Sequence, residues 1–205
     1  MGFNSEKQLF QTAVESIEFQ HLASLYPNTT SLVEPDGLFG IPDLVIASLG
    51  KSSCEVKAFA FEMKLSNWQR ALVQAFRYRA FAEISFVVMD HNHIKPALAS
   101  ISRFKKAHIG LLSFSTEGEL FVHHQPQENK PYCERTRATL EQLLKGTEIG
   151  RRMTLNEPDS SLSPNLRLQA HRFQNCLHLR VEAATAPESI AVPGNYTFEL
   201  VSFNS

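Results

Sequence analysis

Three charged residues between positions 40 and 68 have the types and spacing of a site that could cleave phosphodiester bonds. Asp43 follows Pro42 at the start of one apolar run, and Glu62 and Lys64 end a second run as a Glu-x-Lys triplet. Two adjacent carboxylates can share a divalent cation, and a nearby lysine can orient or deprotonate a water molecule bound to that cation. This chemistry requires the three side chains to meet in the fold.

Neither pattern is distinctive by itself, because the chain holds three Pro-Asp pairs and three Glu-x-Lys triplets. The competing segments are Pro35-Asp36, Pro158-Asp159, Glu55-Val56-Lys57 and Glu128-Asn129-Lys130. Sequence matching therefore does not choose among them, and the choice depends on which carboxylates the strands bring together.

The two apolar runs, 43–49 and 55–65, predict an antiparallel hairpin with its turn at 50–53. A turn centred near residue 52 places Asp43 opposite residue 61 or 62. Cross-strand neighbours have Cβ atoms about 5 Å apart, so Glu62 lies beside Asp43 and Lys64 lies one step further on the same face. A register that used Glu55 would leave most of the second run without a partner strand.

The second run also predicts two different faces, because side chains alternate along a strand. Glu62 and Lys64 share their face with two alanines, and that face has room for a helix or a substrate. The opposite face carries Phe59, Phe61 and Met63 and is expected to be core. Two carboxylates at the end of such a buried strand pair are costly without a cation. Oxygen ligands of this kind suit Mg²⁺ or Mn²⁺, so the sequence predicts metal-dependent hydrolysis of phosphodiesters.

The segments IPDLVIA and FAFEMK resemble the PD-(D/E)xK nuclease superfamily, whose members have the restriction-endonuclease-like fold. The resemblance covers about residues 5–90. It implies that Asp43 and Glu62 are metal ligands, that the main-chain carbonyl of Met63 is a further ligand, and that Lys64 is the catalytic lysine. The implied cofactor is Mg²⁺ or Mn²⁺.

Two further features fit this resemblance. Many members carry an acidic residue on the first helix, and Glu6 is preferred here over Glu15 and Glu18 because it lies on the apolar side of the predicted helix. The segment QAFRY matches the Q-x-x-x-Y pattern of RecB-type members and makes Gln74 and Tyr78 neighbours on one helical face. From there they could reach a water near the metal or the nucleic-acid backbone. The alternative for all three is an ordinary helix surface.

The elements that would position these residues alternate between helices and strands. Periodicity and turn signals predict helices at 5–25, 67–82, 95–106 and 132–145, and strands at 29–34, 43–49, 55–65, 84–90, 108–115 and 118–125. The order predicts an α/β fold, with a restriction-endonuclease-like mixed β-sheet flanked by helices. Residues 1–150 are expected to form the nuclease-like domain, and 151–205 a linker and C-terminal extension of unknown role.

Composition limits the remaining choices. The chain has 205 residues and a net charge of −1, and no apolar run approaches the length of a membrane span. Its three cysteines are widely separated and no secretory signal is visible, which indicates a cytoplasmic protein with reduced thiols. Between Lys64 and Lys106, eight Lys and Arg residues face only two Asp and Glu residues, which favours a phosphate-facing surface.

The sequence therefore predicts a Mg²⁺-dependent deoxyribonuclease that serves repair, recombination, restriction or genome defence. The partner is nucleic acid, with DNA preferred over RNA, and a homodimer is compatible with the extension. The alternative is a catalytically inactive member of the fold that binds nucleic acid or protein. Endonuclease against exonuclease activity, sequence or structure specificity and oligomeric state stay open.

Overall fold

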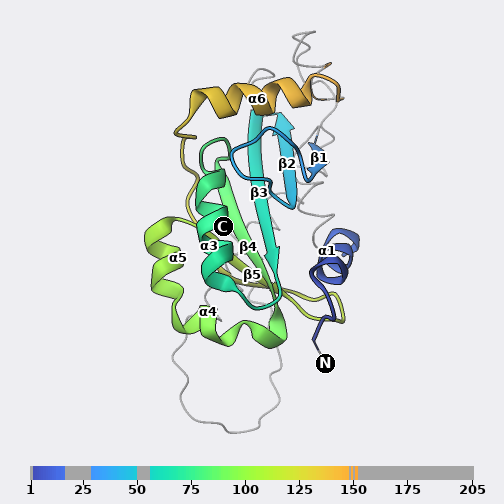
Figure 1. The fold of residues 1–205 in the computed structure, drawn as a ribbon, viewed down its shortest axis with the longest axis vertical. Helices are drawn as coiled ribbons and strands as arrows, with labels where there is room; N and C mark the ends of the chain where they lie inside the picture. The colour runs from blue at the N-terminus through green and yellow to red at the C-terminus, as the bar shows by residue number, and fades with distance from the viewer. Residues whose placement is uncertain (1, 17–28, 50–55, 148, 150, 152–205) are drawn as a thin grey trace, which may run out of the picture.

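The computed structural model describes residues 2–16, 29–49, 56–147, 149 and 151. These residues form a six-stranded sheet with helices on both faces (Figure 1). The elements, in chain order, are α1 (Glu6–Glu15), β1 (Thr29–Val33), β2 (Leu44–Leu49), β3 (Val56–Lys64), α3 (Trp68–Tyr78), β4 (Ile84–Asp90), the 3-10 helix η1 (His91–His93), α4 (Lys95–Ala99), α5 (Ile101–Ala107), β5 (Gly110–Phe114), β6 (Leu120–His124) and α6 (Glu134–Leu144).

The strands lie in the sheet in the order in which they occur in the chain. β1, β2 and β3 form an antiparallel meander, β3, β4 and β5 run parallel, and β6 returns antiparallel to β5. The parallel connections pass through α3 and through α4 with α5. The mixed α/β sheet flanked by helices is thus confirmed. The carboxyl ends of the three parallel strands meet at one edge, where open α/β sheets commonly bind ligands.

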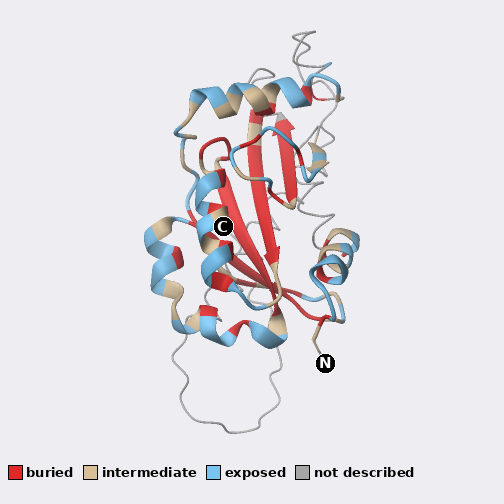
Figure 2. Ribbon diagram, in the orientation of Figure 1, coloured by how far each residue is buried: buried red, intermediate tan, exposed pale blue. Residues whose placement is uncertain are grey.

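Apolar side chains cover both faces of the sheet. One face packs against α3, α4, α5 and α6 through small residues of β3 such as Ala58 and Ala60. The other packs against α1 through Phe59, Phe61 and Met63. Burial from both sides explains why every residue of β4 is buried (Figure 2). The predicted division of β3 into a small-residue face and a phenylalanine face is therefore correct.

The loop after β3 places α3 over the small-residue face. The Asn67 side chain caps the helix by accepting a hydrogen bond from the Arg70 N–H at 3.2 Å. The buried residues of α3, Trp68, Ala71, Ala75 and Tyr78, recur at helical spacing and face the sheet. The helix therefore presents its last turn to the carboxyl half of β3.

Two helices differ from the sequence prediction. α1 ends at Glu15, because Ser16 is extended and its hydroxyl donates to the Ala13 carbonyl at 2.9 Å, which satisfies one of the last helical acceptors. The helix expected at 95–106 is two helices, since Ser100 leaves the helical region and its N–H bonds to the Ala97 carbonyl. The expected turn at 50–53, helical residues 17–25 and nearly all of the extension 151–205 lie outside the described residues.

At the amino end of β3 and β4, Arg137 ties α6 to the sheet. Its guanidinium contacts Glu83 at 2.9 Å and donates to the carbonyls of Phe81, at 2.6 Å, and Val56. Glu83 also accepts from the Ala58 N–H at 2.6 Å. The Glu83 carboxylate is partly buried, and these contacts join α6 to the strands. It lies at the amino end of β3, whereas Glu62 lies near the carboxyl end. No helix in the described part of the chain has the length and hydropathy to cross a bilayer.

Gly110 is required for the packing of the parallel strands. Gly110 pairs with Phe86 across the two strands, and a Cβ at Gly110 would lie 2.1 Å from the Phe86 ring. The Phe86 ring stacks on the Phe61 ring, with 5.4 Å between the ring centres. We expect Gly110→Ala to lower the free energy of unfolding by about 1–3 kcal/mol, the usual cost of overpacking. Urea denaturation measures this, and Gly146→Ala, where the added Cβ meets open space, is the control. Equal stability of the two variants would contradict the prediction.

Candidate active site

Asp43 and Glu62 meet through the register of β2 and β3. The last ladder pair is Leu44 with Phe61, so the next pair outward joins Asp43 and Glu62, as the hairpin register predicts. Asp43 is held by the main chain of β3, because its Oδ2 accepts a hydrogen bond from the Met63 N–H at 2.5 Å. Within the described part of the chain, no hydrogen-bond donor contacts the second oxygen, Oδ1.

Glu62 is a buried carboxylate whose side chain is only 1% exposed. Its Oε1 lies 2.9 Å from the Lys64 ammonium, and its Oε2 accepts a short hydrogen bond from the Tyr78 hydroxyl. Both oxygens therefore have partners, as a buried charge requires. The partners come from β3 itself and from the last turn of α3.

The Lys64 ammonium contacts carboxylates from both faces of the sheet. It contacts Glu62 at 2.9 Å, the Met63 carbonyl at 3.0 Å and Glu6 of α1 at 3.2 Å. The Lys64 side chain is 13% exposed, so the ammonium is largely shielded from bulk water. It contacts two of the oxygens that the sequence proposes as metal ligands, Glu62 Oε1 and the Met63 carbonyl.

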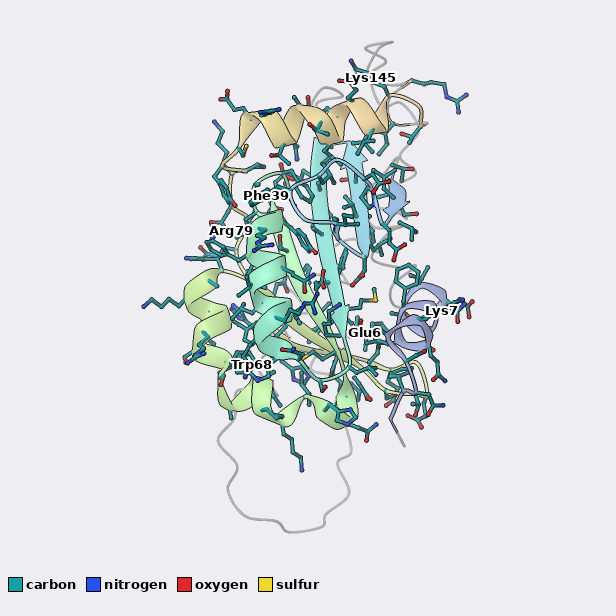
Figure 3. All side chains as sticks on the ribbon, in the orientation of Figure 1. Glu6, Lys7, Phe39, Trp68, Arg79 and Lys145 are labelled. Carbon is teal, nitrogen blue, oxygen red and sulfur yellow. The ribbon has the colours of Figure 1, made fainter. Side chains whose placement is uncertain are left out.

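Of the three acids considered on the first helix, the structure brings Glu6 to Lys64. Figure 3 shows Glu6 on the side of α1 that faces the sheet, with Lys7 on the outer side. Glu15 is exposed, and Glu18 lies outside the described residues. Glu6 is 52% exposed, so this contact is a solvent-facing ion pair and contributes little stability by itself.

Gln74 and Tyr78 both reach the site from α3, but in different ways. Tyr78 is buried, and its hydroxyl contacts the Glu62 carboxylate and the Ile41 carbonyl, the latter at 3.1 Å. It positions Glu62 and is not on a solvated helix edge. Gln74 lies close enough to the Tyr78 hydroxyl to affect its pKa, and its amide oxygen is buried with no hydrogen-bond partner among the described residues.

The electrostatics of the site follow from burial of like charges. Burial raises the pKa of Asp43, and burial together with the Asp43 charge raises the pKa of Glu62. For Lys64, burial acts to lower the pKa, but the contacts with Glu62 outweigh it, and the pKa is raised. The pKa of Tyr78 is raised by burial and by its contact with Glu62. Lys64 is therefore an ammonium at neutral pH and Tyr78 a neutral hydrogen-bond donor.

The donor set suits a hard divalent cation. Asp43 and Glu62 supply carboxylate oxygens, and Met63 supplies a main-chain carbonyl that points into the same site, as its contact with Lys64 shows. Mg²⁺ prefers oxygen ligands and keeps several of its waters. The unpartnered buried oxygen of Gln74 is a fitting acceptor for a water in the site. The residues present thus fit Mg²⁺ or Mn²⁺.

Two main-chain features of the site were not predicted from the sequence. The Ile41 carbonyl holds the Tyr78 hydroxyl, and Gly40, with φ +80, lets the loop pass over the Tyr78 ring, which a Cβ would approach to 3.0 Å. In the sequence, the segment Gly40–Asp43 predicts a functional role only for its aspartate. Its glycine was the available signal, since a positive φ next to an aromatic side chain favours glycine.

Replacing Tyr78 by phenylalanine should destabilise the protein. The change removes the hydroxyl that serves Glu62 and Ile41 and leaves a buried carboxylate oxygen without its donor. We expect the free energy of unfolding to fall by about 1–3 kcal/mol, measured by urea denaturation. Tyr132→Phe is the matched control, because the Tyr132 hydroxyl is exposed and its contact with the Arg77 carbonyl is 3.5 Å long. Similar losses in both variants would show that the Tyr78 hydroxyl does not support Glu62.

Comparison with models of protein families, with curated proteins and with solved structures finds no match to this chain.

Proposed function

We propose that this protein is a Mg²⁺-dependent nuclease with the restriction-endonuclease-like fold, acting on DNA. The observation that carries the proposal is the convergence of Asp43, Glu62 and Lys64 at the carboxyl end of β3, with the Met63 carbonyl between them. Glu62 is buried and paired with Lys64, but the partly buried Asp43 has no cation within contact distance among the described residues, so its charge is costly unless a further cation binds. A site that lowers the stability of a small fold in this way is better explained by a function than by structure.

The division of roles follows from the contacts. Asp43 and Glu62 would be the carboxylate ligands, and the hydrogen bond from the Tyr78 hydroxyl fixes the Glu62 carboxylate. When bound, Mg²⁺ would supply charge neutralisation at the phosphate and a lower pKa for its water. Gln74 offers a buried acceptor to a water molecule.

Lys64 is assigned the role of hydrogen-bond donor to the reacting phosphate. Its contacts with Glu62 and Glu6 favour the ammonium form, which donates hydrogen bonds and has no lone pair with which to accept a proton. As an ammonium it can orient the attacking water through a lone pair and stabilise the negative charge that develops on phosphate oxygens. Glu6 keeps the ammonium at the site from the outer side.

Cleavage assays test the proposal directly. Purified full-length protein is incubated with labelled single-stranded, double-stranded and branched DNA and with RNA, in Mg²⁺, in Mn²⁺ and in EDTA. We expect cleavage of DNA that requires the metal and disappears in EDTA. Asp43→Asn, purified in parallel, controls for contaminating nucleases.

The proposal would be overturned if the protein bound nucleic acid but cleaved none of these substrates under any of the conditions. That result would favour the alternative, a catalytically inactive module in which Lys64 is only the counter-ion of Glu62. Cleavage of RNA alone would keep the chemistry and change the substrate.

A further inference from the structure

Three exposed aromatic side chains surround the last turn of α3, beside the candidate active site. Phe39 is 55% exposed, Phe76 45% and Tyr132 57%, and exposed apolar side chains that gather at one place can mark a binding site. Phe76 belongs to α3, whereas Phe39 comes from the β1–β2 loop and Tyr132 from the segment before α6. The Tyr132 main-chain N–H donates to the Arg79 carbonyl at 3.3 Å, and its hydroxyl contacts the Arg77 carbonyl.

Arginines back two of these rings. The Arg77 guanidinium lies 6.0 Å from the centre of the Phe39 ring, and the Arg79 guanidinium lies 5.5 Å from the centre of the Phe76 ring. Figure 3 labels Phe39 and Arg79. Each phenylalanine therefore combines a flat apolar surface with an adjacent positive charge. We call Phe39, Phe76 and Tyr132, with these two arginines, the aromatic platform.

The aromatic platform is connected to the proposed catalytic residues by short stretches of chain. Phe39 precedes Gly40 and Ile41, whose carbonyl holds Tyr78, and Asp43 follows at a distance of at most about 14 Å along an extended chain. Arg77 immediately precedes Tyr78, whose hydroxyl contacts Glu62. The aromatic platform and the candidate active site are therefore linked through one turn of α3, which carries Phe76 and Arg77 as well as Tyr78.

The charge of this surface complements nucleic acid. α3 carries Arg70 and Arg77 and no Asp or Glu, and Arg79 follows it directly. The acids nearest to Phe39 in this loop are Asp36 and Asp43, three and four residues away in the chain. Exposed aromatic rings with adjacent cations are the features with which proteins bind single strands, because an unpaired base can stack on a ring and its phosphate can face the cation. In a duplex the base faces are already stacked on one another and are not accessible to such rings.

We propose that the aromatic platform stacks unpaired bases, so that the substrate is single-stranded DNA or a single-stranded end or flap. This inference rests on the proposed nuclease function for its choice of ligand. Phe39 and Phe76 provide the stacking surfaces, Tyr132 extends them, and Arg77 and Arg79 hold the phosphates. The site then receives a strand that has already been separated from its complement.

Binding in the absence of metal tests the platform independently of cleavage. Fluorescence anisotropy in EDTA, at one fixed salt concentration, compares a labelled 15-nucleotide oligo-dT with a labelled duplex of equal length. We expect the double variant Phe39→Ala with Phe76→Ala to bind the single strand about 10- to 100-fold more weakly, as the loss of base stacking predicts, with duplex binding changed less than about twofold. Phe39→Trp in an otherwise wild-type chain should retain binding, and its added indole fluorescence should be quenched by the oligonucleotide.

Matched controls remove other exposed side chains. Leu143→Ala removes an exposed apolar side chain from α6, and Lys145→Ala removes a cation at the far end of that helix (Figure 3). Neither should affect binding of oligo-dT, and thermal unfolding should be unchanged in all the variants because the side chains are exposed. Unaltered binding by the double variant, or an equal loss on duplex DNA, would overturn the inference. Failure of the proposed nuclease function would instead appear as absent cleavage by the wild-type protein, with this binding result intact.

Discussion

Replacing Lys64 by glutamine is expected to slow Mg²⁺-dependent cleavage by about 10²- to 10⁴-fold, the usual loss when a positioned charge or proton donor is removed. The ammonium lies 2.9 Å from Glu62 and 3.0 Å from the Met63 carbonyl, where it is shielded from water. Glutamine can still donate a hydrogen bond to Glu62, so the buried carboxylate keeps a partner and the fold is retained. What disappears is the positive charge that the proposed mechanism places beside the scissile phosphate. Single-turnover cleavage under saturating metal measures the loss.

Lys7→Gln is the matched control for this change. Lys7 is exposed on the outer side of α1, next in sequence to Glu6, and the same charge is removed without touching the site. Its cleavage rate should stay within about twofold of wild type, because a remote surface charge affects mainly long-range steering. A Lys64→Gln protein as active as this control would show that the ammonium is a structural counter-ion. Retained binding of Mg²⁺ by Lys64→Gln would separate loss of chemistry from loss of metal.

The central hairpin could be predicted from the sequence because its constraints are local. Alternation along β3 determines which side chains share a face, and a short connection limits the register, so Glu62 could be chosen over Glu55 as the partner of Asp43. The continuous apolar run of β4 is likewise typical of a strand that is covered on both faces. The preference for Glu6 over Glu15 and Glu18 followed from the side of the helix on which it lies, whereas its contact with Lys64 was not predicted.

Contacts that depend on tertiary packing could not be predicted in this way. The burial of Tyr78 depends on how closely α3 lies on Ala58 and Ala60, and its bond to Ile41 depends on a loop whose path is set by the positive φ of Gly40. The aromatic platform brings together three segments that are far apart in the chain. Helix ends depended on single hydrogen bonds, as at Ser16, which periodicity does not encode.

Replacing Asp43 by asparagine is expected to abolish the stabilisation of the folded protein by Mg²⁺. The amide oxygen of asparagine can still accept the Met63 N–H, so the local structure is retained while one carboxylate ligand is lost. A ligand that binds only the folded state at 100 times its dissociation constant adds about 2.7 kcal/mol to the free energy of unfolding. Wild-type protein should therefore melt at a higher temperature as Mg²⁺ is added, and Asp43→Asn should not respond.

The same substitution should change the pH dependence of stability without metal. The pKa of Asp43 is raised in the folded protein above its usual 3.8, chiefly by burial, so the folded state binds more protons than the unfolded state between those two pKa values. The free energy of unfolding of the wild type therefore falls as the pH rises through that window, and the full cost is present at neutral pH. Asp43→Asn lacks this cost, so it should be more stable than wild type at pH 7, and the difference should vanish on acidification below pH 4.

His123 titrates over part of the same range in the opposite direction. Burial lowers the pKa of His123 to about 4, so its contribution to stability is lost as the pH falls below its usual 6.5. The difference between wild type and Asp43→Asn, measured by urea denaturation at each pH in EDTA, cancels this contribution because both proteins retain the histidine.

Glu83→Gln is the control for loss of a buried carboxylate outside the site. Glu83 also has a pKa raised by burial, but it is paired with Arg137 at the opposite end of β3. Its replacement removes the shorter of the two ion pairs of the guanidinium, which keeps Glu141 at 3.3 Å, and should lower stability, yet the Mg²⁺-dependent rise in melting temperature should persist. Neutralising a carboxylate that serves the structure lowers the free energy of unfolding. Neutralising a carboxylate that serves as a metal ligand raises the free energy of unfolding when no metal is bound. If Asp43→Asn is less stable than wild type at pH 7 and still responds to Mg²⁺, Asp43 serves the structure. That result would remove the basis for a metal site.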